Sequence, residues 1–333
     1  MQTMEPVILS HGSVSPAGVG TQSLESGFPT MIHPETEGHP VSLVERSDPA
    51  LLKWEKSPRL RRASPISYFM VEAVSQALEG APGLDLSRTA VVGAFFLGCM
   101  AYSVRFYREM HAAGRRFASP ILFPETVFNT PLSHVVSTLG IGGPVHTQIG
   151  DKSCWATALR TAECWLRLGM ADHVVVVGAE EFDPVSFHAF RAAGLLRHGR
   201  LIPSEGAGAV LLGKASGETP LLSRIADGYG FPARRLAGEA ALECLASIPG
   251  NDPVMPTSTS WTAPIESRTA GERLLDPWIN RDFEASTASA AWNTIRAAKL
   301  IAQGRLPGIV VPCWGLTRQF SMLRLNAWAK ATP

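Results

Sequence analysis

Short, continuously apolar segments that recur between helical patterns constrain the fold of this chain more than any other feature. Ala90–Phe96, Val174–Val177 and Ala209–Leu212 are runs without the polar alternation of a half-exposed strand. Strands of this kind are buried on both faces, which is typical of a sheet covered by helices on each side. Between them, Ile66–Leu78 has apolar residues at helical spacing, and Lys152–Leu168 is typical of a long helix ended by a glycine. The alternation predicts an α/β fold around a buried, mostly parallel sheet.

The second half of the chain repeats this alternation more weakly. Its expected strands and helices are Leu221–Ile225, Ile309–Val311, Phe320–Leu325, Glu239–Ser247 and Ala285–Gln303. The chain has 333 residues, of which 45% are hydrophobic, so it is long and apolar enough to bury a sizeable core. We therefore expect a folded protein and not a disordered chain.

Charge and cysteine content exclude several classes of function. Lys and Arg number 30 against 29 Asp and Glu, a net charge of +1, so no global field favours nucleic acid or an anionic membrane as partner. The apolar runs are far shorter than the roughly 20 residues of a membrane span, and residues 1–13 lack a signal-peptide pattern. We expect a cytoplasmic protein. The five cysteines are scattered without CxxC spacing, so we expect no disulfide framework, no metal and no cofactor.

Four segments, in order along the chain, carry a family resemblance. They are Val7–Gly18, Ser119–Pro144, Pro203–Leu212 with its Glu-Gly-Ala-Gly run, and Cys313–Thr317. Their order and spacing resemble those of a β-ketoacyl synthase, a condensing enzyme of the thiolase fold, over nearly the whole chain. The resemblance implies an α/β thiolase-like fold with two related βαβαβ-type halves in a five-layered α-β-α-β-α arrangement. It also implies a dimer.

The resemblance places a ketosynthase-like half at residues 1–215 and an abbreviated one at 216–333, within one compact unit. In this family a cysteine thiol at the start of a buried helix accepts the acyl group. Aligned without gaps from Gly143–Pro144 to Ala158–Leu159, that cysteine corresponds to Lys152. An acylated lysine is an amide, which does not pass its acyl group on.

The two catalytic histidines of the family's second half are also missing. All nine histidines of this chain lie at or before His198. The resemblance aligns the second of the pair with Ser286 and the lysine that precedes it with Arg281, and it places the first in the loop Thr257–Ser260. Without the thiol and the histidines, ordinary decarboxylative condensation by this chain is not expected.

The sequence leaves the role of Lys152 open. Its side chain either pairs with a neighbouring carboxylate such as Asp151 or faces solvent, or it has a lowered pKa and serves as a base or ligand anchor. Cys154 follows two residues later, about 200° around the helix axis. It is either a displaced nucleophile or a core cysteine. The acidic run Glu180–Asp183 is expected to cap a following turn.

Three functions agree with these residues. The first is a partner without condensing activity, similar to the chain length factor that forms a heterodimer with an active ketosynthase, although Lys stands here where such factors carry Gln. The second is an enzyme with changed chemistry, such as acyl transfer, thioester hydrolysis or decarboxylation. Its candidate residues are Lys152, Asp151, Ser153, Cys154, Ser286 and Arg281. The third is a non-catalytic protein that binds an acyl chain or an acyl carrier protein.

Two questions about partners stay open at this level. A homodimer is the alternative to the heterodimer with an active ketosynthase. The stretch Lys53–Arg62 holds five basic residues, and it is either a solvated face or a surface that receives an acidic acyl carrier protein.

Overall fold

The computed structural model describes residues 5–197, 201–214 and 219–327, and a mixed sheet forms its centre. Among these residues the sheet has nine strands, in the spatial order β12-β13-β10-β1-β9-β7-β5-β6, with β2 paired to β1. The strands are β1 (Val7–Ser15), β2 (Gly18–Val19), β5 (Thr89–Phe95), β6 (Val145–Ile149), β7 (His173–Glu180), β9 (Gly206–Gly213), β10 (Leu221–Gly230), β12 (Gly308–Trp314) and β13 (Gln319–Asn326). Two short pairs complete the strands described, β3 (Met31–Ile32) with β4 (Pro40–Val41) and β8 (Ile202–Pro203) with β11 (Phe283–Glu284).

The expectation of a mostly parallel sheet is wrong. Within the described part of the main sheet, only the pairs β5–β6 and β5–β7 are parallel, whereas β9, β1, β10, β13 and β12 join it antiparallel. Continuous apolar runs report burial on both faces of a strand and not its direction. Chain connections decide direction, since a turn as short as residues 315–318 between β12 and β13 allows only an antiparallel pair.

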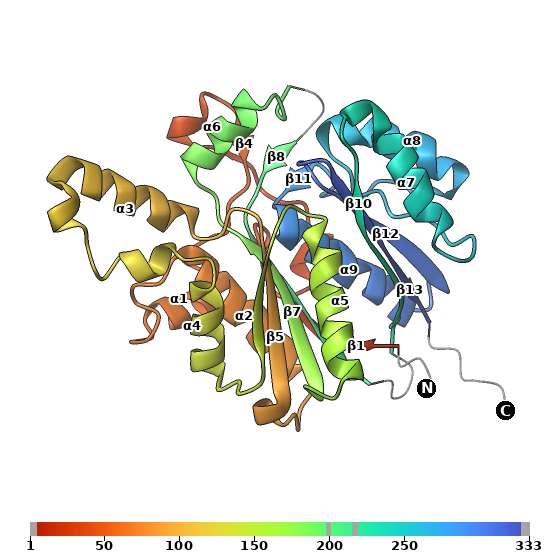
Figure 1. The fold of residues 1–333 in the computed structure, drawn as a ribbon, viewed down its shortest axis with the longest axis horizontal. Helices are drawn as coiled ribbons and strands as arrows, with labels where there is room; N and C mark the ends of the chain where they lie inside the picture. The colour runs from red at the N-terminus through yellow and green to blue at the C-terminus, as the bar shows by residue number, and fades with distance from the viewer. Residues whose placement is uncertain (1–4, 198–200, 215–218, 328–333) are drawn as a thin grey trace.

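Helices lie on both outer faces of the sheet and between its two parts, which confirms the expected five layers (Figure 1). On one outer face α2 covers β1, β9 and β7 with α4 beside it; in the middle α5 and α9 contact β7 on one side and β10, β12 and β13 on the other; and α7 covers β10 and β13 from the far side. The helices are α1 (Pro49–Glu55), α2 (Pro65–Glu79), α3 (Met100–Ala113), α4 (Thr130–Leu139), α5 (Cys154–Arg167), α6 (Pro184–Ala192), α7 (Ala237–Ala246), α8 (Ala263–Ala270) and α9 (Ser286–Ala302).

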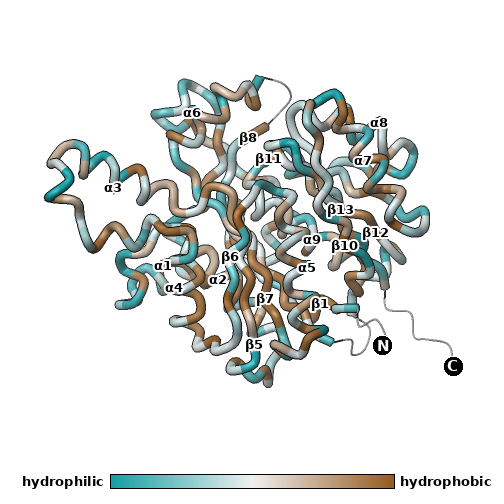
Figure 2. Tube along the Cα trace, viewed as in Figure 1, coloured by the Kyte–Doolittle hydropathy of each residue, from teal (hydrophilic) through white to brown (hydrophobic). Residues whose placement is uncertain are grey.

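Three hydrophobic clusters fill the contacts between these layers. The largest lies around α5 and α9 and includes Trp155 and Trp292, and the tube in Figure 2 is strongly hydrophobic along β5 and β7. The second lies under α2, and the third lies under α7. Because α5 and α9 pack against strands on both sides, the residues at the starts of these two helices lie inside the molecule.

Small residues let α9 approach the sheet closely. A side chain at Gly178 of β7 would place its Cβ 2.4 Å from the backbone oxygen of Thr287 in the first turn of α9. At Gly208 of β9 a Cβ would lie 2.7 Å from that of Ala291. Separations below 3.0 Å are not tolerated without movement. The two glycines therefore fix where α9 begins.

The boundary expected between residues 215 and 216 lies outside the described residues and stays a prediction. After it, the second half contributes β10, β12 and β13 to the main sheet as described. In the described ranges, no helix is both long and apolar enough to cross a membrane.

Candidate functional site

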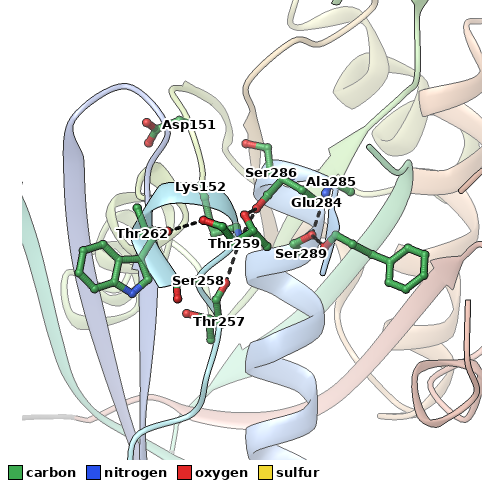
Figure 3. A network of polar contacts seen from close by, with 12 residues as sticks. Asp151, Lys152, Thr257, Ser258, Thr259, Thr262, Glu284, Ala285, Ser286 and Ser289 are labelled. Carbon is green, nitrogen blue, oxygen red and sulfur yellow. Dashed lines mark hydrogen bonds and ion pairs between the residues drawn. The ribbon is translucent and has the colours of Figure 1, made fainter. Parts of the chain in front are cut away.

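Lys152 lies in the short connection between β6 and α5, with its side chain 2% exposed. Its ammonium nitrogen Nζ lies 2.6 Å from Oε2 of Glu284 and 3.4 Å from the backbone oxygen of Thr257 (Figure 3). The expected pair with a carboxylate is therefore present, but the carboxylate is that of Glu284 and not of Asp151, and the side chain does not face solvent. The physical reason is that the chain enters α5 one layer below the surface, where a cation needs a carboxylate within reach.

Glu284, at the end of β11, organises this site. Besides the lysine, its carboxylate accepts hydrogen bonds from the Thr259 hydroxyl at 2.9 Å and from the backbone N–H of Ser286 at 2.8 Å. Its side chain is also 2% exposed. Sequence reasoning missed this residue. The signal that could have found it is the need of a buried lysine for a counter-charge, combined with the two-residue spacing from Ser286.

Ser286 begins α9 and adopts a left-handed backbone conformation with φ of 42°. Its buried hydroxyl has no hydrogen-bond partner within the described residues. Arg281 lies nearby and donates from Nε to the backbone oxygen of Ser258 at 3.3 Å. The structure thus brings Lys152, Ser286 and the loop Thr257–Ser260 together, with Arg281 touching that loop. A nucleophilic serine needs an adjacent base, and the described residues place none on this hydroxyl.

Asp151 and Ser153 serve the neighbouring turn. The Asp151 carboxylate accepts from the backbone N–H of Thr317 at 2.7 Å and from the hydroxyl of Ser153 at 2.8 Å. It packs so closely on Gly315 that a Cβ there would lie 2.3 Å from Oδ1. These contacts connect the turn after β12 to the start of α5, so Asp151 and Ser153 have a structural role.

Cys154 is the first residue of α5 and is buried. Its Sγ lies 3.3 Å from the backbone oxygen of Gly150 and donates to it. Burial, the largest influence, raises the pKa of this thiol well above its usual range, and the nearby charges of Glu180 and Asp151 act in the same direction. Because the thiolate is the reactive form, this environment disfavours a nucleophilic role of Cys154 at neutral pH.

The acidic run Glu180–Asp183, which begins at the last residue of β7, holds neighbouring segments in place. Asp183 accepts from the backbone N–H of Val185 at 2.7 Å and caps α6, as expected. Glu181 accepts from Ser64 and from two backbone N–H groups at the starts of α2 and α3, and Glu180 accepts from Phe96, Leu97 and Thr287. Burial raises the pKa of both glutamates to about 7 against these hydrogen bonds.

Little space remains beside these residues. A cavity of about 20 Å³ lies between Ser286, Ser204 and Ser186, whose hydroxyls are buried without partners in the described part of the chain. That volume accommodates about one water molecule, not an acyl chain. Across residues 5–197, 201–214 and 219–327, no group of three or more His, Cys, Asp or Glu side chains is arranged to hold a metal ion.

Solved structures of ketosynthase and chain length factor proteins share this architecture. The ishigamide ketosynthase/chain length factor superposes with a TM-score of 0.81 at 18% identity, covering 98% of this chain and 100% of that chain. A chain of the ketosynthase and chain length factor complex of Xenorhabdus doucetiae superposes with 0.76 at 14% identity, covering 98% and 99%. At these identities the likeness shows the fold.

Sequence comparison identifies the family. No curated protein matches significantly. A family model does match, that of the β-ketoacyl synthase N-terminal domain, over residues 32–218. This span is more than half of the chain, and the region carries the β6–α5 connection described above. The chain belongs to the β-ketoacyl synthase family.

Proposed function

We propose that this protein is a non-condensing member of the family that pairs with an active ketosynthase, as a chain length factor does. The position of the family's nucleophile carries this proposal. The side chain of Lys152 is held there in a buried ion pair with Glu284, and the cavity beside Ser286 has a volume of only about 20 Å³. A chain so altered is suited to complete an assembly and not to carry the acyl intermediate.

The edge of the sheet supports a partner. β6 is the terminal strand beside β5, and its outer side has no neighbouring strand among the described residues. Val145 and Ile149 of β6 are 45% and 53% exposed, and residues four apart in a strand share a face. Exposed apolar edge strands are a liability in a free monomer. A partner strand at this edge would lie directly before Lys152.

A second apolar surface lies on α3 and the segment 114–126 that follows it. Helix α3 extends away from the body of the molecule in Figure 1. The large exposed side chains of this surface, which we call the arm, are Tyr107, Phe117, Ile121 and Phe123. Several large exposed apolar side chains in one region are typical of interaction sites. We propose that this arm also contacts the ketosynthase partner. The assembly would then be located in the cytoplasm, together with its ketosynthase. We further propose that an acyl carrier protein binds to this assembly.

Affinity purification of the tagged full chain from its native host tests this function. We expect a ketosynthase with an intact Cys-His-His triad to co-purify with this protein in a one-to-one ratio. Binding of such a partner would bury the exposed edge of β6 and the arm. The double variant V145K/I149K is expected to lose that partner and keep its own fold, since charge on an edge strand opposes pairing.

Leu242→Lys provides the matched control. Leu242 lies on α7 and is 53% exposed, so the same change in polarity is made away from the edge. This variant should keep the partner. A stable homodimer that does not bind a ketosynthase would contradict the proposal. Retention of the ketosynthase by the V145K/I149K variant would also contradict it.

A further inference from the structure

A larger cavity of about 460 Å³ lies beside the second half of α9. Arg296, Lys299 and Leu300 of this helix line it together with Trp278 from the loop before β11. Ser286 and Arg296 are ten residues apart on α9, which is about 15 Å along a helix axis. The cavity is therefore separate from the Lys152 site, and its volume is typical of a small-molecule pocket.

The cavity has an excess of positive charge. Arg296, Lys299 and Arg305 line it against Glu25 and Asp276. Only Lys299 is neutralised, by Glu25 at 3.3 Å. Arg296 and Arg305 form no ion pair with any described residue. One positive charge is thus in excess, and the guanidinium groups are the cations left without a counter-ion.

Arg296 is placed as an anion ligand. Its guanidinium carbon lies 3.8 Å from the ring centroid of Trp278, which fixes the plane of the group. Its Nε is buried and has no acceptor among the described residues. Burial lowers the pKa of Arg296 to about 10. Burial is the largest influence, and the nearby Glu25 carboxylate offsets it only in part, so a bound anion would complete the compensation of this cation.

The rest of the wall is mixed, with polar Gln22 and Gln303 beside an apolar part that includes three leucines. Leu275, Leu300 and Leu306 are partly exposed side chains that pack on the central hydrophobic cluster, and all three line the cavity. A purely ionic ligand such as phosphate would leave these side chains in water. The chemistry of the wall instead matches a molecule with an anionic end and an apolar body.

We propose that this cavity binds a small amphiphilic anion, a carboxylate or phosphate monoester on an apolar chain, with Arg296 as its main anion ligand. The inference does not rest on the proposed function. It is carried by the cavity, the unpaired guanidinium held on Trp278, and the leucine wall.

Calorimetric titration of the full chain with octanoate, octyl phosphate and 1-octanol tests the proposal. We expect one or both anions to bind at a single site at least about tenfold more tightly than the alcohol, because charge-assisted hydrogen bonds to a guanidinium are strong. The tighter of the two anions identifies the head group. Equal binding of the alcohol, or no binding of either anion, overturns the proposal.

Arg296→Gln separates binding from a structural role. It should weaken anion binding by at least about tenfold while the melting temperature without ligand stays equal or rises, because an uncompensated cation is removed. Arg88→Gln, which alters a surface pair with Asp172, should leave binding unchanged. Unchanged affinity in Arg296→Gln, or a clearly lowered melting temperature without ligand, contradicts the inference.

Discussion

At the scale of single residues, Lys152, which the sequence resemblance aligns with the family's thiol, forms a buried ion pair with Glu284. Lys152 and Glu284 have each lost their water, and they compensate one another through one contact of 2.6 Å and further hydrogen bonds. Such pairs contribute little net stability, but removing one partner leaves an uncompensated charge.

A double-mutant cycle on this pair has a clear expected outcome. Lys152→Met should lower the free energy of unfolding by about 3–5 kcal/mol, and adding Glu284→Gln should restore part of that loss. Urea unfolding measures all variants. Arg88→Met, at an exposed pair with Asp172, should change stability by less than about 1 kcal/mol. A Lys152→Met variant as stable as the wild type would show that the pair does not form.

Glu181 predicts a pH dependence of stability. Burial raises the pKa of its carboxyl from 4.5 to about 7 in the folded protein, so the folded state binds more protons than the unfolded state between these values. Its contribution to stability is complete below about pH 4.5, falls as pH rises and levels off above about pH 7. Relative to Glu181→Gln, the wild type should lose up to about 3 kcal/mol between pH 4.5 and 7. Urea unfolding at several pH values measures this difference, and a wild type that gains stability relative to Glu181→Gln as pH rises would contradict the expected sign.

At the scale of elements, the contact of α9 with β7 positions the site. Gly178→Ala should lower the free energy of unfolding by about 1–3 kcal/mol, because the new Cβ would lie 2.4 Å from the Thr287 backbone oxygen and would push the start of α9 away. Thermal unfolding checks this. Gly230→Ala in β10, whose nearest neighbour would be 3.9 Å away, should be close to neutral. Equal effects of the two changes would mean that the close approach does not constrain α9.

The helices also show how well the periodicity of apolar residues predicts secondary structure. The helix expected over Lys152–Leu168 is Cys154–Arg167, and that expected over Ala285–Gln303 is Ser286–Ala302. Helical spacing of apolar residues located both, because one face must be buried along the full length. Strand direction was not predictable from the same pattern, since it depends on connections and not on burial.

At the scale of the whole molecule, the proposal of a non-condensing partner predicts no covalent loading. After incubation with acyl thioesters of coenzyme A and of acyl carrier protein, the intact mass should be unchanged, because Cys154 is a buried thiol with a raised pKa and Lys152 is held by Glu284. An active ketosynthase treated in the same way should gain the acyl mass. A stable adduct mapped to Lys152, Ser153 or Cys154 would favour the alternative of changed acyl chemistry.

The sequence by itself determined which chemical groups this protein has and the class of its fold. The absence of a thiol at position 152 and of any histidine after His198 follows from residue identity alone, and the α/β class follows from the periodicity of burial. Only the tertiary structure decided the partner of Lys152, because Glu284 is 132 residues away and the layered packing brings the two together. The same holds for the pocket at Arg296, whose wall comes from segments that no local pattern connects.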